Sequence, residues 1–296
     1  MATPTLKQLD AFYWAATCAN FSTAAQRLHL SISSLSKRIN ELEQVMGRAL
    51  FDRSGHRAVL TEDGETLLPA AIRVLESVGA LQDAFARDKG LTGRLRFGVG
   101  ELSALTWLPR FVATVQKSHP QLMLEPYVDV GAVLENKVDA GELDFAVIAG
   151  RSSRGSVLSQ RVTEARFAWM AAETLVGGER TLTATLLQRH ALVTLPAGAG
   201  TTRVLDEWLL AAGINNPRQI ACNNWSAVAG MLREGVGIGF LPADWAAAAQ
   251  MGTALVRLTS EPALSTLPYA FQWRRGDMRG LIPSMLALVR QHAAFR

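Results

Sequence analysis

Two helical segments lie so close together near the N-terminus that only a tight turn can join them. The first covers residues 23–28 with Ser22 as its expected N-cap, and the second covers residues 31–45 with Ser31 as its cap. Only residues 29–30 remain between them. Two short helices joined in this way form a helix-turn-helix, whose second member is free to enter a DNA major groove. The pair therefore predicts a DNA-binding unit in residues 1–60.

A small two-stranded wing is predicted directly after these helices. Residues 49–53 and 56–60 flank Ser54 and Gly55, a pair typical of a turn. From Arg27 to Arg57 the chain carries six basic residues and three acidic ones (Glu41, Glu43 and Asp52). A charge run alone is more often a solvated helix face, but its place on a helix-turn-helix favours contact with DNA phosphates.

The second helix of the pair has an apolar and a polar face. Leu35, Ile39 and Leu42 share the apolar face and are expected to pack inward. Serine hydroxyls and the cations on the other face can contact base edges or phosphates. Ile32 has two interpretations, packing beneath the first helix or lying against a thymine methyl group. The expected DNA-contacting residues are Ser22, Thr23, Ile32, Ser33, Ser36, Lys37, Arg38, Arg53 and Arg57.

Residues 61–90 are predicted to form one long helix that begins after Thr61 as its cap. Its apolar residues recur at the heptad spacing of a coiled coil. A lone helix with such a seam has nothing to pack against unless a second chain supplies a partner, so we expect a dimerisation linker. The seam consists of Leu67, Ala71, Val74, Val78, Leu81 and Phe85.

The remaining residues, 91–296, alternate strand and helix patterns, which predicts an α/β domain with mostly parallel sheets. Two similar sets of elements occur, and a strand at 269–273 brings the chain back to the first. We therefore expect two lobes with a ligand cleft between them. The expected lobe 1 comprises residues 91–162 and 268–296, and the expected lobe 2 comprises residues 163–267.

Composition and motifs argue against several classes of protein. A hydrophobic content of 49% is ordinary for a globular chain, and a net charge of +4 permits a nucleic-acid partner without requiring one. No apolar run reaches the roughly 18 residues of a membrane span, and Lys7, Gln8 and Asp10 interrupt the first apolar run. Two cysteines in unrelated segments suit a reducing compartment, so we expect a cytoplasmic protein.

Enzyme chemistry is not indicated either. The chain has no GxGxxG, no phosphate-binding lysine motif and no GxSxG elbow. Its five histidines are scattered, with no i, i+4 pair and no Cys/His cluster. We expect no catalytic residues, no metal and no cofactor.

Several motifs in fixed order resemble the LysR-type transcriptional regulators. FSTAAQRLHLS at 21–31, LSKRINELE at 35–43, GRALFDR at 47–53 and LTEDG at 60–64 carry the resemblance in the N-terminal part. GELDFAVI at 141–148 and EGVGIGFLP at 234–242 look like the family's effector domain. Two segments depart from the pattern: Ile32-Ser33 replaces a common Gln-Pro, and LVGGE at 175–179 replaces a His-Pro-Leu stretch.

The resemblance implies a winged helix-turn-helix, a linker helix and a two-lobed domain similar to periplasmic binding proteins. It also implies a homodimer that assembles to a homotetramer on promoter DNA, a small-molecule effector, and RNA polymerase as a partner. An effector-independent DNA-binding protein, whose lobes serve only oligomerisation, is the alternative.

Loops at strand ends supply the effector candidates. Glu101 and Ser103 precede a helix start whose N–H groups suit an anion, where similar regulators usually present a hydroxyl. Ser103 fits that pattern, whereas Glu101 would disfavour a carboxylate ligand unless Arg151 or Arg203 neutralises it. Amides and an indole in lobe 2 suit a ligand with a flat part, although they also suit helix caps and a core position. The candidates are Glu101, Ser103, Gly150, Thr201, Thr202, Asn224 and Trp225.

Overall fold

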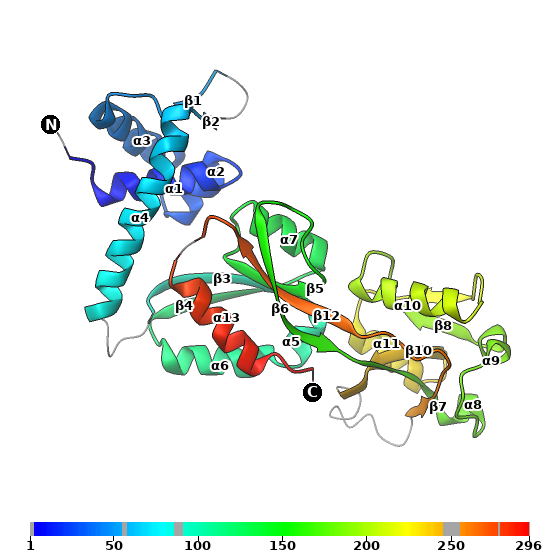
Figure 1. Cartoon of the computed structure of the whole chain (residues 1–296). Helices are drawn as coiled ribbons and strands as arrows, with labels where there is room; N and C mark the ends of the chain where they lie inside the picture. Colours follow the sequence, from blue (N-terminus) through cyan, green and yellow to red (C-terminus); the bar gives the residue numbers. More distant parts are fainter. Residues whose placement is uncertain (1–2, 55–57, 86–90, 245–254, 278, 296) are drawn as a thin grey trace.

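The computed structural model describes residues 3–54, 58–85, 91–244, 255–277 and 279–295. Figure 1 shows an elongated molecule in which an N-terminal helical unit and two sheets, each with its own helices, follow one another. We call these three parts the head, lobe 1 and lobe 2, and helix α4 joins the head to lobe 1. No helix within the described ranges is long and apolar enough to cross a membrane.

The head is the predicted helix-turn-helix with a small wing. Leu35, Ile39 and Leu42 are fully buried in its core together with Phe12, so the inward face of the second helix is confirmed. The elements are α1 (Leu6–Thr17), α2 (Phe21–Arg27), α3 (Ile32–Met46), β1 (Phe51–Asp52) and β2 (Val59–Leu60), the two strands pairing antiparallel.

The ends of the head's helices follow local capping chemistry. The Ser31 hydroxyl accepts the N–H of Ser34 at 3.1 Å, which confirms it as the cap of α3. The prediction that Ser22 caps α2 is wrong. Asn20 takes that place, accepting the N–H of Thr23 at 2.9 Å, because α2 begins at Phe21, whose ring packs edge-on against Phe51 at 5.2 Å.

Helix α4 (Glu62–Phe85) divides its apolar seam between two environments. Thr61 caps it, its hydroxyl accepting the N–H of Gly64 at 3.1 Å. Ala71 is buried against the head, whereas Val74 and Leu81 are 43% and 60% exposed. The first part of the seam therefore packs within the chain, contrary to the expectation that a second chain must cover all of it. The side chain of Phe85 lies outside the described residues.

Lobe 1 is a five-stranded sheet with helices on both faces. Phe97, Phe145 and Phe271 stack at centroid distances of 5.2 and 4.4 Å on the face covered by α6 and α13, and α7 covers the other face (Figure 1). The strand order is β4-β3-β5-β12-β6. The elements are β3 (Gly93–Val99), α5 (Glu101–Leu105), α6 (Leu108–Ser118), β4 (Leu122–Val128), α7 (Gly131–Asp139), β5 (Phe145–Ala149), β6 (Val157–Ala165), β12 (Leu267–Arg274) and α13 (Leu281–His292).

Lobe 2 repeats this layout with the strand order β11-β7-β10-β8-β9. Alternating glycines in β10 let it approach β8, because a Cβ on Gly237 or Gly239 would lie 2.2 or 2.4 Å from a carbonyl oxygen of β8. The elements are β7 (Phe167–Ala172), α8 (Glu173–Val176), α9 (Ala184–Arg189), β8 (Ala191–Thr194), α10 (Gly200–Ala211), β9 (Gln219–Ala221), α11 (Trp225–Arg233), β10 (Gly237–Pro242) and β11 (Leu255–Leu258).

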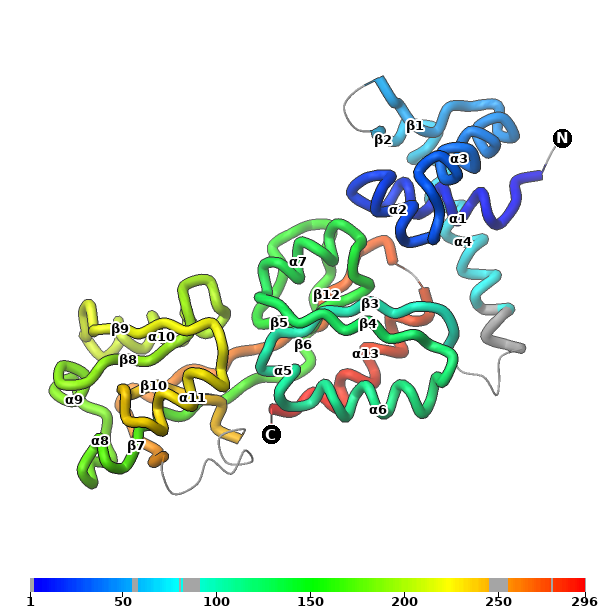
Figure 2. The backbone as a smooth tube through the Cα atoms, turned by 180° about the vertical axis from the view of Figure 1, so that it is seen from behind, coloured from blue at the N-terminus to red at the C-terminus, as the bar shows by residue number. Residues whose placement is uncertain are grey.

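The chain crosses between the lobes at β6–β7 and returns before β12, as the views from both sides show (Figures 1 and 2). Strands β3, β4 and β5 are parallel, and so are β8, β9 and β10. The expectation of mostly parallel sheets is wrong for the crossing strands. β12 pairs antiparallel with β5 and β6, and β7 pairs antiparallel with β10 and β11, because a returning chain reverses its direction.

Candidate functional site

Helix α3 presents a polar face with one apolar residue at its start. Ile32 is 53% exposed, so it does not pack beneath the first helix, and Ser33 and Lys37 are exposed beside it. Ser36 and Arg38 are half-buried on the same helix. Within the described residues Lys37 has no ion pair, so its charge is directed to solvent.

The other basic residues of the head are partly used by the fold. Arg53 lies 3.2 Å from Glu43, whose other oxygen accepts the backbone N–H groups of Leu50 and Phe51 at 2.8 and 3.1 Å. Glu43 thus ties the wing to α3 and offsets the charge of Arg53. Arg57 lies outside the described residues. At the start of α2, Ser22 is exposed, and Thr23 is held by the Asn20 cap.

Arg27 does not belong to the outward basic surface, although it contributed to the predicted basic excess. Its guanidinium points to lobe 1, donating to the carbonyl of Gly141 and to the carboxylate of Asp144, the latter at 2.7 Å. Only 6% of its side chain is exposed. Fewer basic side chains are therefore available to a partner than the six counted in the sequence from Arg27 to Arg57.

Asp144 is the centre of the junction between the head and lobe 1. Its side chain is fully buried and accepts from Arg27, from Arg279 and from the backbone N–H of Arg96, each at 2.7 Å. Burial raises the pKa of this carboxyl, but the guanidinium groups of Arg279 and Arg27 outweigh burial and hold the pKa below its ordinary value. The Asp144 carboxylate is therefore ionised and fully matched.

The ring of Trp14 lies beside the guanidinium groups of Arg27 and Arg279 and beside a third one, from Arg274. The Cζ atoms of Arg27, Arg274 and Arg279 lie 5.1, 5.4 and 5.1 Å from its centroid. A backbone hydrogen bond from Ala19 to the carbonyl of Ala140, at 3.2 Å, also crosses the junction. The short motifs of the sequence carry no signal for this junction, since its partners are more than 100 residues apart.

The lobes meet at Glu101. Its carboxylate accepts the Nδ2–H of Asn224 at 2.7 Å and the backbone N–H of Trp225 at 3.0 and 3.1 Å, both at the start of α11 in lobe 2. Burial raises the pKa of Glu101, and the hydrogen bond from Trp225 offsets only part of the rise. The sequence suggested that Arg151 or Arg203 could neutralise Glu101, but neither forms an ion pair with it among the described residues. Arg203 lies 3.6 Å from Glu207 instead.

The lobe 2 candidates combine cleft and structural roles. Asn224 also caps α11, its Oδ1 accepting the N–H of Ala227 at 2.8 Å, which is the alternative that the sequence left open. The Trp225 side chain is buried against Phe167, with ring centroids 6.1 Å apart, and its backbone N–H contacts lobe 1 through Glu101. Thr202 donates to the carbonyl of Pro196 at 3.2 Å.

The other candidates are Ser103 and Gly150 in lobe 1 and Thr201 in lobe 2. Ser103 is fully buried, and its Oγ has no hydrogen-bond partner among the described residues. Gly150 adopts φ +82° at the end of β5, a left-handed conformation that favours glycine. Thr201 is buried at the start of α10. A Cβ on the neighbouring Gly200 would lie 2.7 Å from the Cβ of Ala149, so the lobes are in contact here as well.

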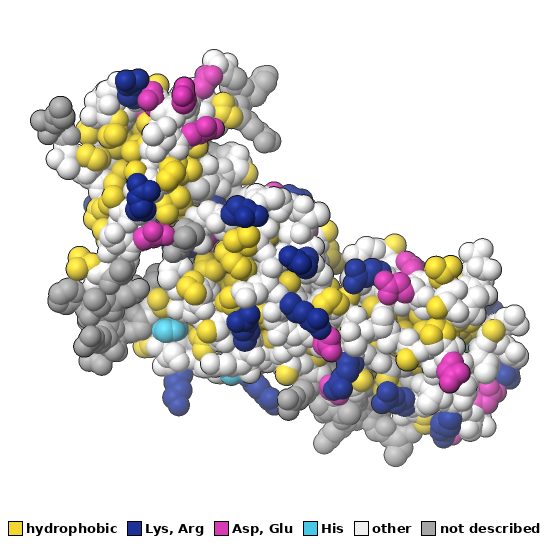
Figure 3. Space-filling view, in the orientation of Figure 1, with side chains coloured by type: hydrophobic (Ala, Val, Ile, Leu, Met, Phe, Trp, Pro, Cys, Tyr) yellow, Lys and Arg dark blue, Asp and Glu magenta, His cyan; other side chains and the backbone are white. Residues whose placement is uncertain are grey.

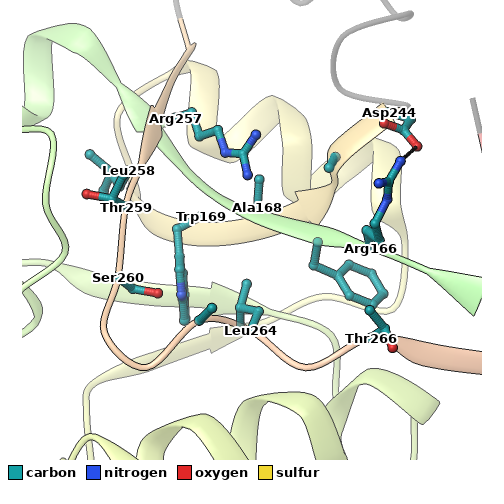
Figure 4. Close-up of a pocket in the computed structure, with 13 residues that line it drawn as sticks. Arg166, Ala168, Trp169, Asp244, Arg257, Leu258, Thr259, Ser260, Leu264 and Thr266 are labelled. Carbon is teal, nitrogen blue, oxygen red and sulfur yellow. Dashed lines mark hydrogen bonds and ion pairs between the residues drawn. The ribbon is translucent and has the colours of Figure 1, made fainter.

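Two cavities lie elsewhere in the described structure, of which the heptad seam of α4 indicated one and no sequence pattern indicated the other. One, of about 450 Å³, is in lobe 2 and is lined by Trp169, Arg257 and Leu264, with the Arg166–Asp244 ion pair at one side (Figure 4). Its described lining includes none of the effector candidates. The other is a groove along α4 that includes Arg73, Val74 and Leu81.

The side chains visible on the surface of α4 differ in character along the helix. Figure 3 shows hydrophobic side chains gathered along α4 and acidic ones near its upper end, where Glu62, Asp63 and Glu65 form the first turn. Within the described part of the chain, no three His, Cys, Asp or Glu side chains form a group suited to a metal ion.

Family models match both parts of the chain. Residues 6–65 match the bacterial regulatory helix-turn-helix protein model of the lysR family, and residues 88–294 match the LysR substrate binding domain.

Similar proteins are found among curated sequences. The uncharacterized HTH-type transcriptional regulator YeiE of Escherichia coli is 28% identical over 242 residues, which is 80% of each chain. A probable RuBisCO transcriptional regulator of Thalassiosira pseudonana is 35% identical over 150 residues, covering 49% of this chain and about half (48%) of that protein.

Solved structures share the fold. A full-length OxyR variant from Pseudomonas aeruginosa has a TM-score of 0.65 at 22% identity, covering 99% of this chain and 100% of that one. CbnR in complex with its target DNA has a TM-score of 0.56 at 19% identity, covering 98% and 100%.

Proposed function

The chain belongs to the LysR family of DNA-binding transcriptional regulators, and from that premise we propose that a small-molecule effector in the cleft between its lobes controls its binding to promoter DNA. It is a regulator and not an enzyme. The observation that carries the effector proposal is the convergence of polar groups from both lobes around Glu101. The fully buried Ser103 hydroxyl, two residues further along, supports it.

In this proposal α3 reads the DNA. Ser33, Ser36, Lys37 and Arg38 contact bases or phosphates, and Ile32 meets a thymine methyl group, which its 53% exposure supports. Ser22, Thr23, Arg53 and Arg57 contact the backbone. Binding selection from random DNA with wild type and Ile32→Gln tests the role of Ile32. A loss of preference for thymine at one position is expected, and identical sequence logos would contradict it.

The proposed assembly uses the exposed part of α4. Residues 61–90 pair with a second copy along the groove that includes Val74 and Leu81, and dimers assemble to tetramers on DNA. RNA polymerase, suggested by the family resemblance alone, is the further partner. The proposed division of the regulatory domain is residues 91–162 with 268–296, and residues 163–267.

The proposed mechanism is a shift of population. An effector that binds one arrangement of the lobes more tightly favours that arrangement in proportion to its differential affinity. Because Asp144 joins the head to lobe 1, a change in lobe 1 is passed to the head as well as to α4. The spacing of paired heads on DNA then changes.

A thermal-shift screen tests the effector proposal against the alternative, in which the lobes serve only oligomerisation. Small acids, amines and aromatic compounds are added to the full chain, since a ligand of the native state raises the melting temperature by mass action. At least one compound is expected to raise it and to alter promoter binding. Sequence-preferring DNA binding with no response to any compound would favour the alternative.

A further inference from the structure

Glu101 places a carboxylate where a helix start suits an anion. The residue begins α5 in lobe 1, yet its oxygens accept two N–H groups at the start of α11 in lobe 2, from Asn224 and Trp225. The first N–H groups of a helix have no partner within it and carry partial positive charge. The carboxylate of one lobe therefore caps a helix of the other.

The cap of α11 is shared between the two lobes. Asn224, from lobe 2, accepts the N–H of Ala227 at 2.8 Å, and Glu101, from lobe 1, accepts the N–H of Trp225 at 3.0 Å. The carboxylate has no cation beside it in the described ion pairs, so only N–H groups compensate its charge there. A free carboxylate could reach the same N–H groups only after Glu101 had left them, because two carboxylates at one site repel each other.

A second contact supports the joined arrangement of the lobes. Gly200, the first residue of α10, approaches Ala149 so closely that a Cβ there would lie 2.7 Å from the alanine Cβ and 3.5 Å from a side-chain carbon of Leu267. This contact is apolar and small. Glu101 is thus the polar element of the junction, and it is reversible because no salt bridge among the described residues holds it.

Resting on the proposed effector function, we propose that Glu101 is a tethered carboxylate that holds the lobes together and reserves the start of α11. The cleft accordingly takes neutral or cationic effectors, which leave Glu101 in place, and excludes simple carboxylates. Glu101 is in this sense a specificity-determining residue. Its removal frees the α11 N–H groups for a small carboxylate from solution.

Acetate rescue tests this proposal in the full chain. Glu101→Ala removes the carboxylate and leaves space for acetate. Melting temperatures are compared in sodium acetate and in sodium chloride at equal ionic strength. Acetate is expected to raise the melting temperature of Glu101→Ala by about 2–4 °C beyond its effect on wild type when it exceeds its dissociation constant several-fold.

Two variants serve as controls. Glu234→Ala removes an exposed carboxylate at the opposite end of α11 and is expected to respond to acetate as wild type does. Glu101→Gln keeps the acceptor and the shape, so acetate is expected to have no added effect on it. Equal responses of Glu101→Ala and wild type would overturn the proposal. If Glu101→Ala does not fold, Glu101→Gly prepared in acetate replaces it, and failure to recover a folded chain with acetate would likewise overturn it.

Hydrogen exchange tests whether Glu101 protects the start of α11 from the other lobe. The Trp225 amide is expected to exchange at least about 10-fold faster in Glu101→Ala, and acetate is expected to restore its protection. Unchanged exchange would overturn the proposal. These tests use neither DNA nor an effector, so their failure leaves the effector cleft standing. Conversely, if the thermal-shift screen finds no effector, a successful acetate rescue of Glu101→Ala still supports the role of Glu101 at the lobe junction.

Discussion

The two junctions of lobe 1 differ in how they compensate a carboxylate. Asp144, facing the head, is fully buried between two guanidinium groups, each 2.7 Å away. Glu101, facing lobe 2, is half-buried and, among the described residues, has only N–H donors from Asn224 and Trp225. Removing one partner of a buried ion pair is costly, whereas the contacts of Glu101 among the described residues include no ion pair. On the proposed effector mechanism we therefore expect the head to stay fixed to lobe 1 and the lobe–lobe junction to be the one that changes.

The largest effect is expected from breaking the matched junction. Asp144→Ala leaves Arg27 and Arg279 buried without their shared partner, and the loss of one member of a buried pair costs about 3–5 kcal/mol. Denaturant unfolding of the full chain measures it. The control Glu142→Ala, which breaks an exposed pair with Lys137, is expected to cost less than about 1 kcal/mol. Similar costs for the two variants would show that Asp144 is not the centre of the junction.

The next prediction separates inward from outward cations of the head. Lys37→Ala is expected to lower the slope of log affinity against log salt by about 1 per head, since it removes a phosphate contact. Arg27→Gln, buried at the junction, is expected to lower stability and leave that slope unchanged. Fluorescence anisotropy of promoter DNA at several salt concentrations measures both. A smaller slope in Arg27→Gln would mean that this residue reaches DNA.

The two junctions are expected to respond oppositely to pH. The pKa of Asp144 is lowered, so its stabilisation is present above the ordinary value of 3.8 and is lost as pH falls through the lower folded value. The pKa of Glu101 is raised, so its ionisation costs stability as pH rises through the raised value. Unfolding free energies of wild type, Asp144→Asn and Glu101→Gln from pH 3 to pH 7 measure this.

As pH rises, the free energy of unfolding of wild type is expected to increase relative to that of Asp144→Asn. Relative to that of Glu101→Gln, it is expected to decrease. Slopes of the same sign would contradict the contrast between the junctions.

The smallest effect is expected from the apolar contact between the lobes. In Gly200→Ala the added Cβ meets Ala149 at 2.7 Å, so the lobes must separate slightly. We expect faster exchange of the Trp225 amide with a change in melting temperature of less than about 2 °C. Gly230→Ala, where no described atom lies within 4 Å of the added Cβ, is the control and should leave exchange unchanged or slower. Equal exchange in both variants would mean that the contact does not matter.

Local signals in the sequence predicted the elements that local chemistry controls. The Ser31 cap and the inward face of Leu35, Ile39 and Leu42 follow from helix capping and periodicity, and both are confirmed. The α/β alternation likewise predicted two lobes. Asn20 replaced Ser22 as a cap because either residue suits that role, and only the packing of Phe21 decides between them.

Long-range partners could not be predicted in this way. Arg27 is 117 residues from Asp144, and Glu101 is 123 residues from Asn224. A count of charges cannot tell an inward guanidinium from an outward one. The heptad seam of α4 likewise cannot reveal that Ala71 packs on the head of its own chain.

Hydrogen exchange of two amides tests the central claim most directly. The Ala19 N–H crosses the head junction to the carbonyl of Ala140, and the Trp225 N–H crosses the lobe junction to Glu101. In the wild-type chain, after correction for intrinsic rates, Trp225 is expected to exchange at least about 10-fold faster than Ala19. Faster exchange at Ala19, or equal rates at both, would contradict the claim that the head is fixed and the lobes switch.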